Sequence, residues 1–167
     1  MLTDLVEIRR LGEKKREENL RFRRHLKTHG LHERRFRHIA QEIEDQIDCT
    51  VCANCCKVAT ARVTERDAER LARHLRVKKA VFLRDYCEES GEEGIILRRN
   101  EAGCVFLSGT ECTVYDERPA SCRDFPHLVR GAASFVARMW EMPDRACYCP
   151  IVYNALERLK VEAEFGI

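Results

Sequence analysis

The chain has 167 residues, of which 44% are hydrophobic and 35% charged, a composition that suits one globular domain with an appended helical arm. Its formal net charge is only +2. No apolar run approaches the roughly eighteen residues of a membrane-spanning helix. The N-terminus also lacks the basic, apolar and small-residue order of a signal peptide, so we expect a cytoplasmic protein without a membrane span.

The small net charge conceals a strongly basic segment. Residues 9–38 carry twelve Lys or Arg and four Glu, a balance of +8, which leaves −6 for the rest of the chain. Such a segment can bind nucleic acid or an acidic protein. We favour a solvated helical face, because no aromatic residues interleave with the arginines and no nucleic-acid motif is present.

Two helices are predicted before the first cysteine. Residues 2–28 lack proline and are rich in good helix formers, and Gly30 is expected to cap this helix at its C-terminus. A second helix is expected over 31–47, where apolar residues recur on one face: Phe36, Ile39, Ala40, Ile43 and Ile47. Together these helices predict a basic hairpin arm over residues 1–48.

His25 and His29 form an i,i+4 pair in the first of these helices. Two imidazoles alone make a weak metal site, so we expect both histidines on the surface.

The middle of the chain alternates strand and helix signals. Residues 57–63 are predicted as a strand, and Thr64 with Asp67 resembles a capping box that starts a helix. A further helix is expected over 78–86. Ile95, Ile96 and Leu97 indicate a strand.

The last third is predicted to hold a hairpin and two helices. The hairpin joins residues 103–107 to 112–115, and Pro119 opens a short helix that carries Cys122. Residues 134–140 fit a strand or a helix equally well. A terminal helix follows Pro150, with an apolar face made by Ile151, Val152, Ala155, Leu156 and Leu159.

Ten cysteines are the dominant chemical feature. In a reducing compartment they favour metal binding or redox chemistry, although their even number also suits disulfides. Cys49, Cys52 and Cys55 form two overlapping C-x-x-C pairs, a spacing that directs two sulfurs at one metal. The same run binds a [4Fe–4S] cluster in bacterial ferredoxins, where a remote Cys-Pro completes the site. Cys149 precedes Pro150 and offers that remote ligand.

Cys56 follows Cys55 directly. Adjacent residues rarely point at one atom, so we expect these two thiols to face different metals or different sides of one cluster.

Five ordered motifs surround the cysteines: Cys49-x-x-Cys52-x-x-Cys55-Cys56, Gly103-Cys104-Val-Phe-Leu107, Glu111-Cys112-Thr-Val-Tyr115, Arg118-Pro119 and Ser121-Cys122-Arg123-Asp-Phe-Pro126. Together they resemble the bacterial YkgJ-like cysteine-cluster (CxxCxxCC) family, which is described as a zinc- or iron-chelating domain. The resemblance covers about residues 49–150. The chain is more distantly similar to the cysteine-rich part of flagellin lysine methylases, which implies an iron–sulfur centre.

The resemblance implies eight thiolate ligands, enough for two four-coordinate sites or for one cluster and a second metal. They are Cys49, Cys52, Cys55, Cys56, Cys104, Cys112, Cys122 and Cys149. Cys87 and Cys147 lie outside this set, and His127 could replace a cysteine. Arg118 and Arg123 could offset repulsion between thiolates, or pair with nearby aspartates.

The expected fold is α+β: a helical hairpin over 1–48, then a cysteine-rich, metal-centred domain over 49–167 with short strands, surrounding helices and a C-terminal helix. The expected function is binding of zinc or iron, including an iron–sulfur cluster. Two alternatives stay open. One is an iron–sulfur redox or radical enzyme. The other is a metal-stabilised adaptor that binds nucleic acid or an acidic protein through residues 9–38.

Overall fold

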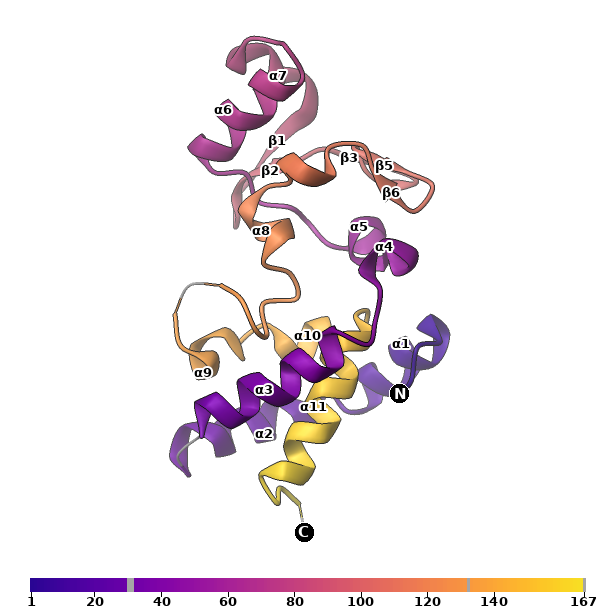
Figure 1. Ribbon diagram of the computed structural model, residues 1–167, viewed down its shortest axis with the longest axis vertical. Helices are drawn as coiled ribbons and strands as arrows, with labels where there is room; N and C mark the ends of the chain where they lie inside the picture. The colour runs from indigo at the N-terminus through magenta and orange to yellow at the C-terminus, as the bar shows by residue number, and fades with distance from the viewer. Residues whose placement is uncertain (30–31, 132, 167) are drawn as a thin grey trace. The chain divides into compact units, whose positions relative to one another are not determined.

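A computed structural model describes residues 1–29, 32–131 and 133–166. The fold is α+β, as predicted, with helices and several short antiparallel strand pairs (Figure 1). The chain divides into two compact units: unit 1 is Met1–Asp48 with Phe125–Ile167, and unit 2 is Cys49–Asp124. Across the described ranges, no helix combines the length and the apolar character needed to cross a bilayer.

Unit 1 is built from helices. Its long C-terminal helix, α11, packs against α1, α3 and α10, while α2 packs against α9 and α10 (Figure 1). The helices of this unit are α1 (Leu5–Lys14), α2 (Arg16–Thr28), α3 (Glu33–Glu44), α9 (Phe135–Arg138), α10 (Met142–Arg145) and α11 (Pro150–Glu162).

The core of unit 1 forms where two predicted apolar faces meet. Phe36, Ile39 and Ile43 of α3 are buried in the same cluster as the apolar face of α11. Phe22 and Leu26 of α2 complete this cluster. The 3.6-residue periodicity of α3 and α11 therefore predicted correctly which side chains are removed from water.

The helix predicted over 2–28 is divided in two at Lys15, where φ is −94° and ψ is 4°. The cause is tertiary packing, which overrides the local helix preference. Gly12 lies so close to the 146–147 backbone that an added Cβ would be 2.5 Å from the Ala146 oxygen. Lys15 is ion-paired with Glu157 of α11. The cap predicted at Gly30 lies outside the described residues.

Unit 2 combines short helices with three antiparallel strand pairs, β1–β2, β3–β4 and β5–β6. A separate apolar cluster, which includes Val63, Leu71, Phe82, Leu97 and Phe106, forms its core. Its elements are α4 (Cys49–Cys52), α5 (Asn54–Val58), α6 (Glu65–His74), α7 (Lys79–Tyr86), β1 (Cys87–Ser90), β2 (Gly94–Leu97), β3 (Arg99–Asn100), β4 (Gly103–Cys104), β5 (Leu107–Ser108), β6 (Glu111–Cys112), the 3₁₀ helix η1 (Tyr115–Glu117) and α8 (Ala120–Arg123).

Several local predictions for unit 2 are confirmed. Thr64 and Asp67 form a full capping box at the start of α6. The strand predicted at 95–97 lies in β2. The hairpin predicted between 103–107 and 112–115 forms only in part: Leu107 pairs with Cys112 in β5–β6, whereas Gly103 and Cys104 pair with β3. Short-range patterns were sufficient for the capping box and for β2, because each of these features depends on residues that are close in sequence.

The strand predicted over 57–63 does not form. Its first two residues end α5, and Arg62 makes only an isolated bridge with Ile96. The guanidinium of Arg99 donates hydrogen bonds to the carbonyls of Lys57 and Ala59. These two carbonyls thus accept hydrogen bonds from a side chain of β3, whereas the backbone of a strand would bond to the backbone of its neighbour.

The compact units also differ from the predicted division at residues 1–48 and 49–167. The predicted boundary after residue 48 is also a boundary between the compact units, but residues from Phe125 onward belong to unit 1. The reason is the apolar face of α11, which is buried against α3.

Candidate metal centre

The first four cysteines lie on α4 and α5, two on each helix, and a turn at Ala53 joins the helices. Ala53 makes this turn in the left-handed region, with φ 47° and ψ 13°, and is buried. A non-glycine residue pays about 1 kcal/mol or more there. Such strained positions concentrate at functional sites.

Gly103 brings the next cysteine segment onto α5. Its φ is +126°, and a Cβ added to it would be 2.6 Å from the Cys56 oxygen and 2.9 Å from the Lys57 Cα. The backbones of α5 and β4 therefore touch directly, which places Cys104 beside Cys56. Arg99, opposite Cys104 in the β3–β4 pair, reinforces this contact by donating to two carbonyls at the end of α5.

Four thiols from four separate segments interact electrostatically with one another. Cys56 is on α5, Cys104 on β4, Cys112 on β6 and Cys122 on α8. Burial raises the pKa of Cys104 and of Cys112, and negative charge on Cys56 raises both further. Burial, followed by repulsion from Cys104 and Cys56, raises the pKa of Cys122 to about 12.

Cys56 is the acidic member of this group. A side-chain hydrogen bond with Cys55 lowers the pKa of Cys56 to about 6, against the opposing effect of burial. The positive charges of Arg118 and Arg99 lower this pKa further. Cys56 is therefore the thiol of this group that ionises most readily, because the pKa values of the other three are raised.

Arg118, which is half-buried, supplies a positive charge next to the thiols. Its guanidinium lies 3.5 Å from the ring centroid of Tyr115, and its charge acts on both Cys56 and Cys112. Within the described ranges its Nε is buried and has no hydrogen-bond partner. A cation with an unused donor suits an anionic group of thiolates around a metal.

Asp67 fixes the helix that carries Cys122, a role that the sequence did not reveal. Its carboxylate is buried and accepts hydrogen bonds from the backbone N–H of Thr64 (3.0 Å), the guanidinium of Arg70 (2.8 Å) and the N–H of Ala120 (3.2 Å). The last bond ties α6 to the start of α8. Burial raises the pKa of Asp67, but these hydrogen bonds outweigh it and the net pKa is lowered.

The other predicted ligands have different surroundings. Cys49 is exposed, and Cys52 and Cys55 are half-buried. Cys149 is buried in unit 1 at the N-cap of α11, and ligation by it stays a prediction.

The remaining two cysteines and His127 also have defined places. Cys87 is part of the apolar core of unit 2, where burial raises its pKa to about 11, as expected of a small hydrophobic residue. Cys147 belongs to unit 1 and contacts the Pro143 carbonyl, with an Sγ–O distance of 3.5 Å. His127, also in unit 1, has a φ of 65°.

The thiols of Cys56, Cys104, Cys112 and Cys122 lie near one another, but their sulfur atoms do not converge on one metal position. Among the described residues, no three His, Cys, Asp or Glu side chains are placed so that they could hold a metal ion. Rotation of the cysteine side chains would be needed to direct the sulfurs inward. The donor chemistry, the partnerless Arg118 Nε and the close approach at Gly103 fit a thiolate-bound metal.

A comparison with family models gives a match over residues 48–150, more than half of the chain. The chain belongs to the CxxCxxCC family. The description of this family reads "Putative zinc- or iron-chelating domain". The predicted resemblance is thus confirmed, and the CxxCxxCC match extends from the residue before α4 to the first residue of α11. No curated protein and no solved structure gives a significant match.

Proposed function

We propose that unit 2 is a thiolate metal centre that binds zinc or iron, with Cys56, Cys104, Cys112 and Cys122 as the ligands of one site. The observation that carries this proposal is the mutual electrostatic interaction of four thiols from four segments, in a family described as chelating. Four sulfur donors suit tetrahedral zinc or iron. A bound metal would link α5, β4, β6 and α8 and would stabilise all the thiolates together.

Cys49, Cys52 and Cys55 form a second set of thiolates in this proposal. Their C-x-x-C-x-x-C spacing suits a separate metal or an iron–sulfur cluster. The division also accounts for adjacent Cys55 and Cys56, which would serve different sites. Cys149 stays a predicted eighth ligand, to be tested by the same measurements.

The test is metal and acid-labile sulfide analysis of protein purified without oxygen, together with its visible spectrum. Single changes to Ser at Cys56, Cys104, Cys112 or Cys122 should each reduce the bound metal. Cys87→Ala and Cys147→Ser are matched controls and should retain it. Full metal content in the Cys104→Ser or Cys112→Ser variant would overturn the assignment.

The same analysis separates the possible functions. Iron with sulfide and a brown colour would support a cluster, and with it a redox or radical enzyme. Zinc without colour would support a structural metal that holds unit 2 folded. Paired thiols without metal would contradict the proposal.

Binding of nucleic acid or an acidic protein is a second candidate, supported by exposed cations. Ten basic residues of the 9–38 segment are exposed. Within the part of the chain that the structure describes, five of these ten have no acidic side chain within ion-pair distance: Lys14, Arg21, Arg24, Lys27 and Arg34. Others are neutralised by acids within unit 1, namely Arg9, Arg10, Lys15, Arg16, Arg35 and Arg37. This reduces the charge available to a partner. Retention on a polyanion that falls steeply with salt would support this candidate, and no retention at low salt would exclude it.

A further inference from the structure

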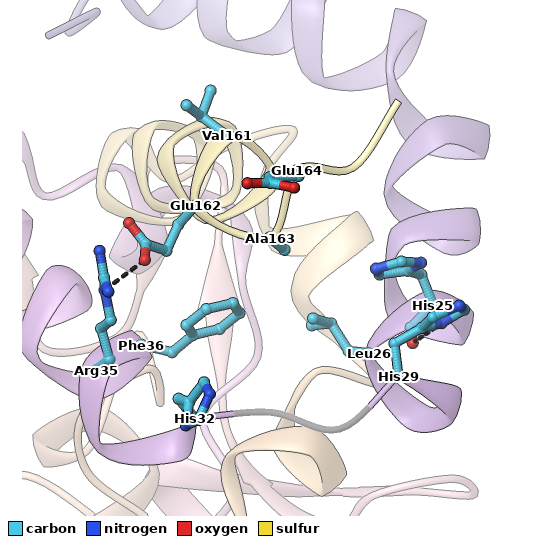
Figure 2. A pocket seen from close by; sticks show the side chains of 10 residues that line it. All are labelled: His25, Leu26, His29, His32, Arg35, Phe36, Val161, Glu162, Ala163 and Glu164. Carbon is cyan, nitrogen blue, oxygen red and sulfur yellow. Dashed lines mark hydrogen bonds and ion pairs between the residues drawn. The ribbon is translucent and has the colours of Figure 1, made fainter. Parts of the chain in front are cut away.

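Unit 1 contains a pocket of about 500 Å³ at the C-terminal end of α2 (Figure 2). This size is within the range of ligand-binding pockets. Three of the six histidines of the chain contribute to its lining: His25, His29 and His32. Leu26 and Phe36 add apolar surface. The pocket is formed by unit 1 alone, so its chemistry can be considered separately from the thiols of unit 2.

His25 and His29 lie side by side in this pocket (Figure 2). Their ring centroids are 4.0 Å apart and the ring planes differ by 15°. The two residues are one helical turn apart on α2 and its C-cap. Two histidines at this i,i+4 spacing on one helix face can bind the same metal ion.

His29 makes hydrogen-bond contacts through its ring nitrogen Nδ1. Its Nδ1 is 3.2 Å from the His25 carbonyl oxygen and 2.8 Å from the Thr28 hydroxyl oxygen. In the tautomer that carries the proton on Nδ1, this nitrogen donates to the carbonyl and Nε2 keeps its lone pair for a metal. A metal-binding histidine is typically oriented in this way, by donation from its other nitrogen to a carbonyl.

The local charge also suits a cation. The last carbonyls of α2 carry partial negative charge, and His25 and His29 lie at this end of the helix. Glu164 lines the same pocket. The positive charge of Arg35 is balanced by its ion pair with Glu162 (Figure 2).

We infer that His25 and His29 form a second metal site, which binds a divalent transition ion of imidazole preference, such as zinc or nickel, through nitrogen. This site differs in chemistry from the thiolate centre and does not depend on it. Since no three donors converge among the described residues, the protein supplies two ligands and water completes the coordination. The two rings are stacked with their centroids 4.0 Å apart, so binding of one ion by both residues requires the rings to turn from this arrangement. Imidazole nitrogen suits both zinc and nickel.

The test uses the full chain as purified, with its native metal in place, titrated with Ni²⁺ by calorimetry. His25→Ala and His29→Ala should each weaken binding by at least about tenfold, because even an outer hydrogen-bond partner of a metal ligand is worth roughly 10- to 100-fold in affinity. His38→Ala and His74→Ala remove exposed histidines elsewhere and should leave the affinity unchanged. Circular dichroism would check that the variants remain folded.

A second measurement keeps the inference open to contradiction. The imidazole nitrogen resonances of His25 and His29 should shift on addition of Ni²⁺, whereas those of His74 should not. Cys104→Ser, which tests the thiolate centre, should leave the nickel affinity intact. Absence of nickel binding, or binding that is lost in Cys104→Ser and kept in His29→Ala, would overturn the inference while leaving the proposed thiolate centre standing.

Discussion

A Cβ on Gly103 would be 2.6 Å from the carbonyl oxygen of Cys56, closer than real Cβ atoms come to other heavy atoms. Helix α5 and strand β4 therefore meet backbone to backbone, and only glycine fits between them.

We expect Gly103→Ala to destabilise unit 2 by about 3 kcal/mol, because it adds a clash with backbone to a positive φ. The variant should also bind less metal, since Cys104 would move away from Cys56. Chemical unfolding and metal analysis would measure both effects. Gly91→Ala is the matched control, because its Cβ would have no neighbour within 4 Å. Normal metal content in Gly103→Ala would show that the close approach is not required.

Arg118 should affect the affinity for the metal and not the stability of the fold. Removal of its charge by Arg118→Gln should weaken metal binding on the order of 10- to 100-fold, as for other groups that surround metal ligands. A competition titration with a coloured chelator would measure the change. Arg73→Gln, at an exposed position of α6, should have no effect. An equal loss in both variants would indicate a general effect of surface charge.

Asp67→Asn should lower the free energy of unfolding of unit 2 by about 2–3 kcal/mol, since the buried carboxylate accepts several hydrogen bonds. The pKa of Asp67 is lowered in the folded protein, so its contribution is complete above the ordinary aspartate value of 3.8 and is lost as the pH falls through the folded pKa.

The difference between wild type and Asp67→Asn should therefore be constant near neutral pH and shrink in acid. Comparing the two proteins at each pH cancels the effect of metal release. Asp85→Asn, at a side chain exposed in the same unit, is the control. A difference that grows in acid would contradict the assigned role of Asp67.

Metal removal should loosen unit 2 and spare unit 1. The two units have separate apolar clusters, and structural metal binding contributes directly to folding. After chelation, amide hydrogen exchange should accelerate over residues 49–124 and stay slow in α3 and α11. Equal acceleration in α11 would show that the units unfold together.

Much of this fold could be predicted from local patterns. The apolar faces of α3 and α11 and the capping box at Thr64 depend on residues within a few turns of one another. The break at Lys15 and the missing strand over 57–63 could not be predicted, because each results from a contact with a distant segment. Periodicity carries no information about such contacts.

The candidate site shows the same limit. The C-x-x-C spacing identified Cys49, Cys52 and Cys55 as neighbours, but it could not pair Cys56 with Cys104. That pairing depends on the absence of a side chain at Gly103, which a single sequence shows only as a glycine. The resemblance to a family supplied the remaining cysteines, although not their grouping.

Unit 2 is one uninterrupted stretch of chain, whereas unit 1 needs segments from both ends of the sequence. A ribosome therefore completes residues 49–124 while α11 has still to be made. During that interval the apolar face of α3 lacks its partner α11, and the cysteine segment is already complete. If unit 2 binds metal as proposed, capture of the metal can precede closure of the helical unit, and the supply of metal during synthesis then bears on the maturation of the whole protein.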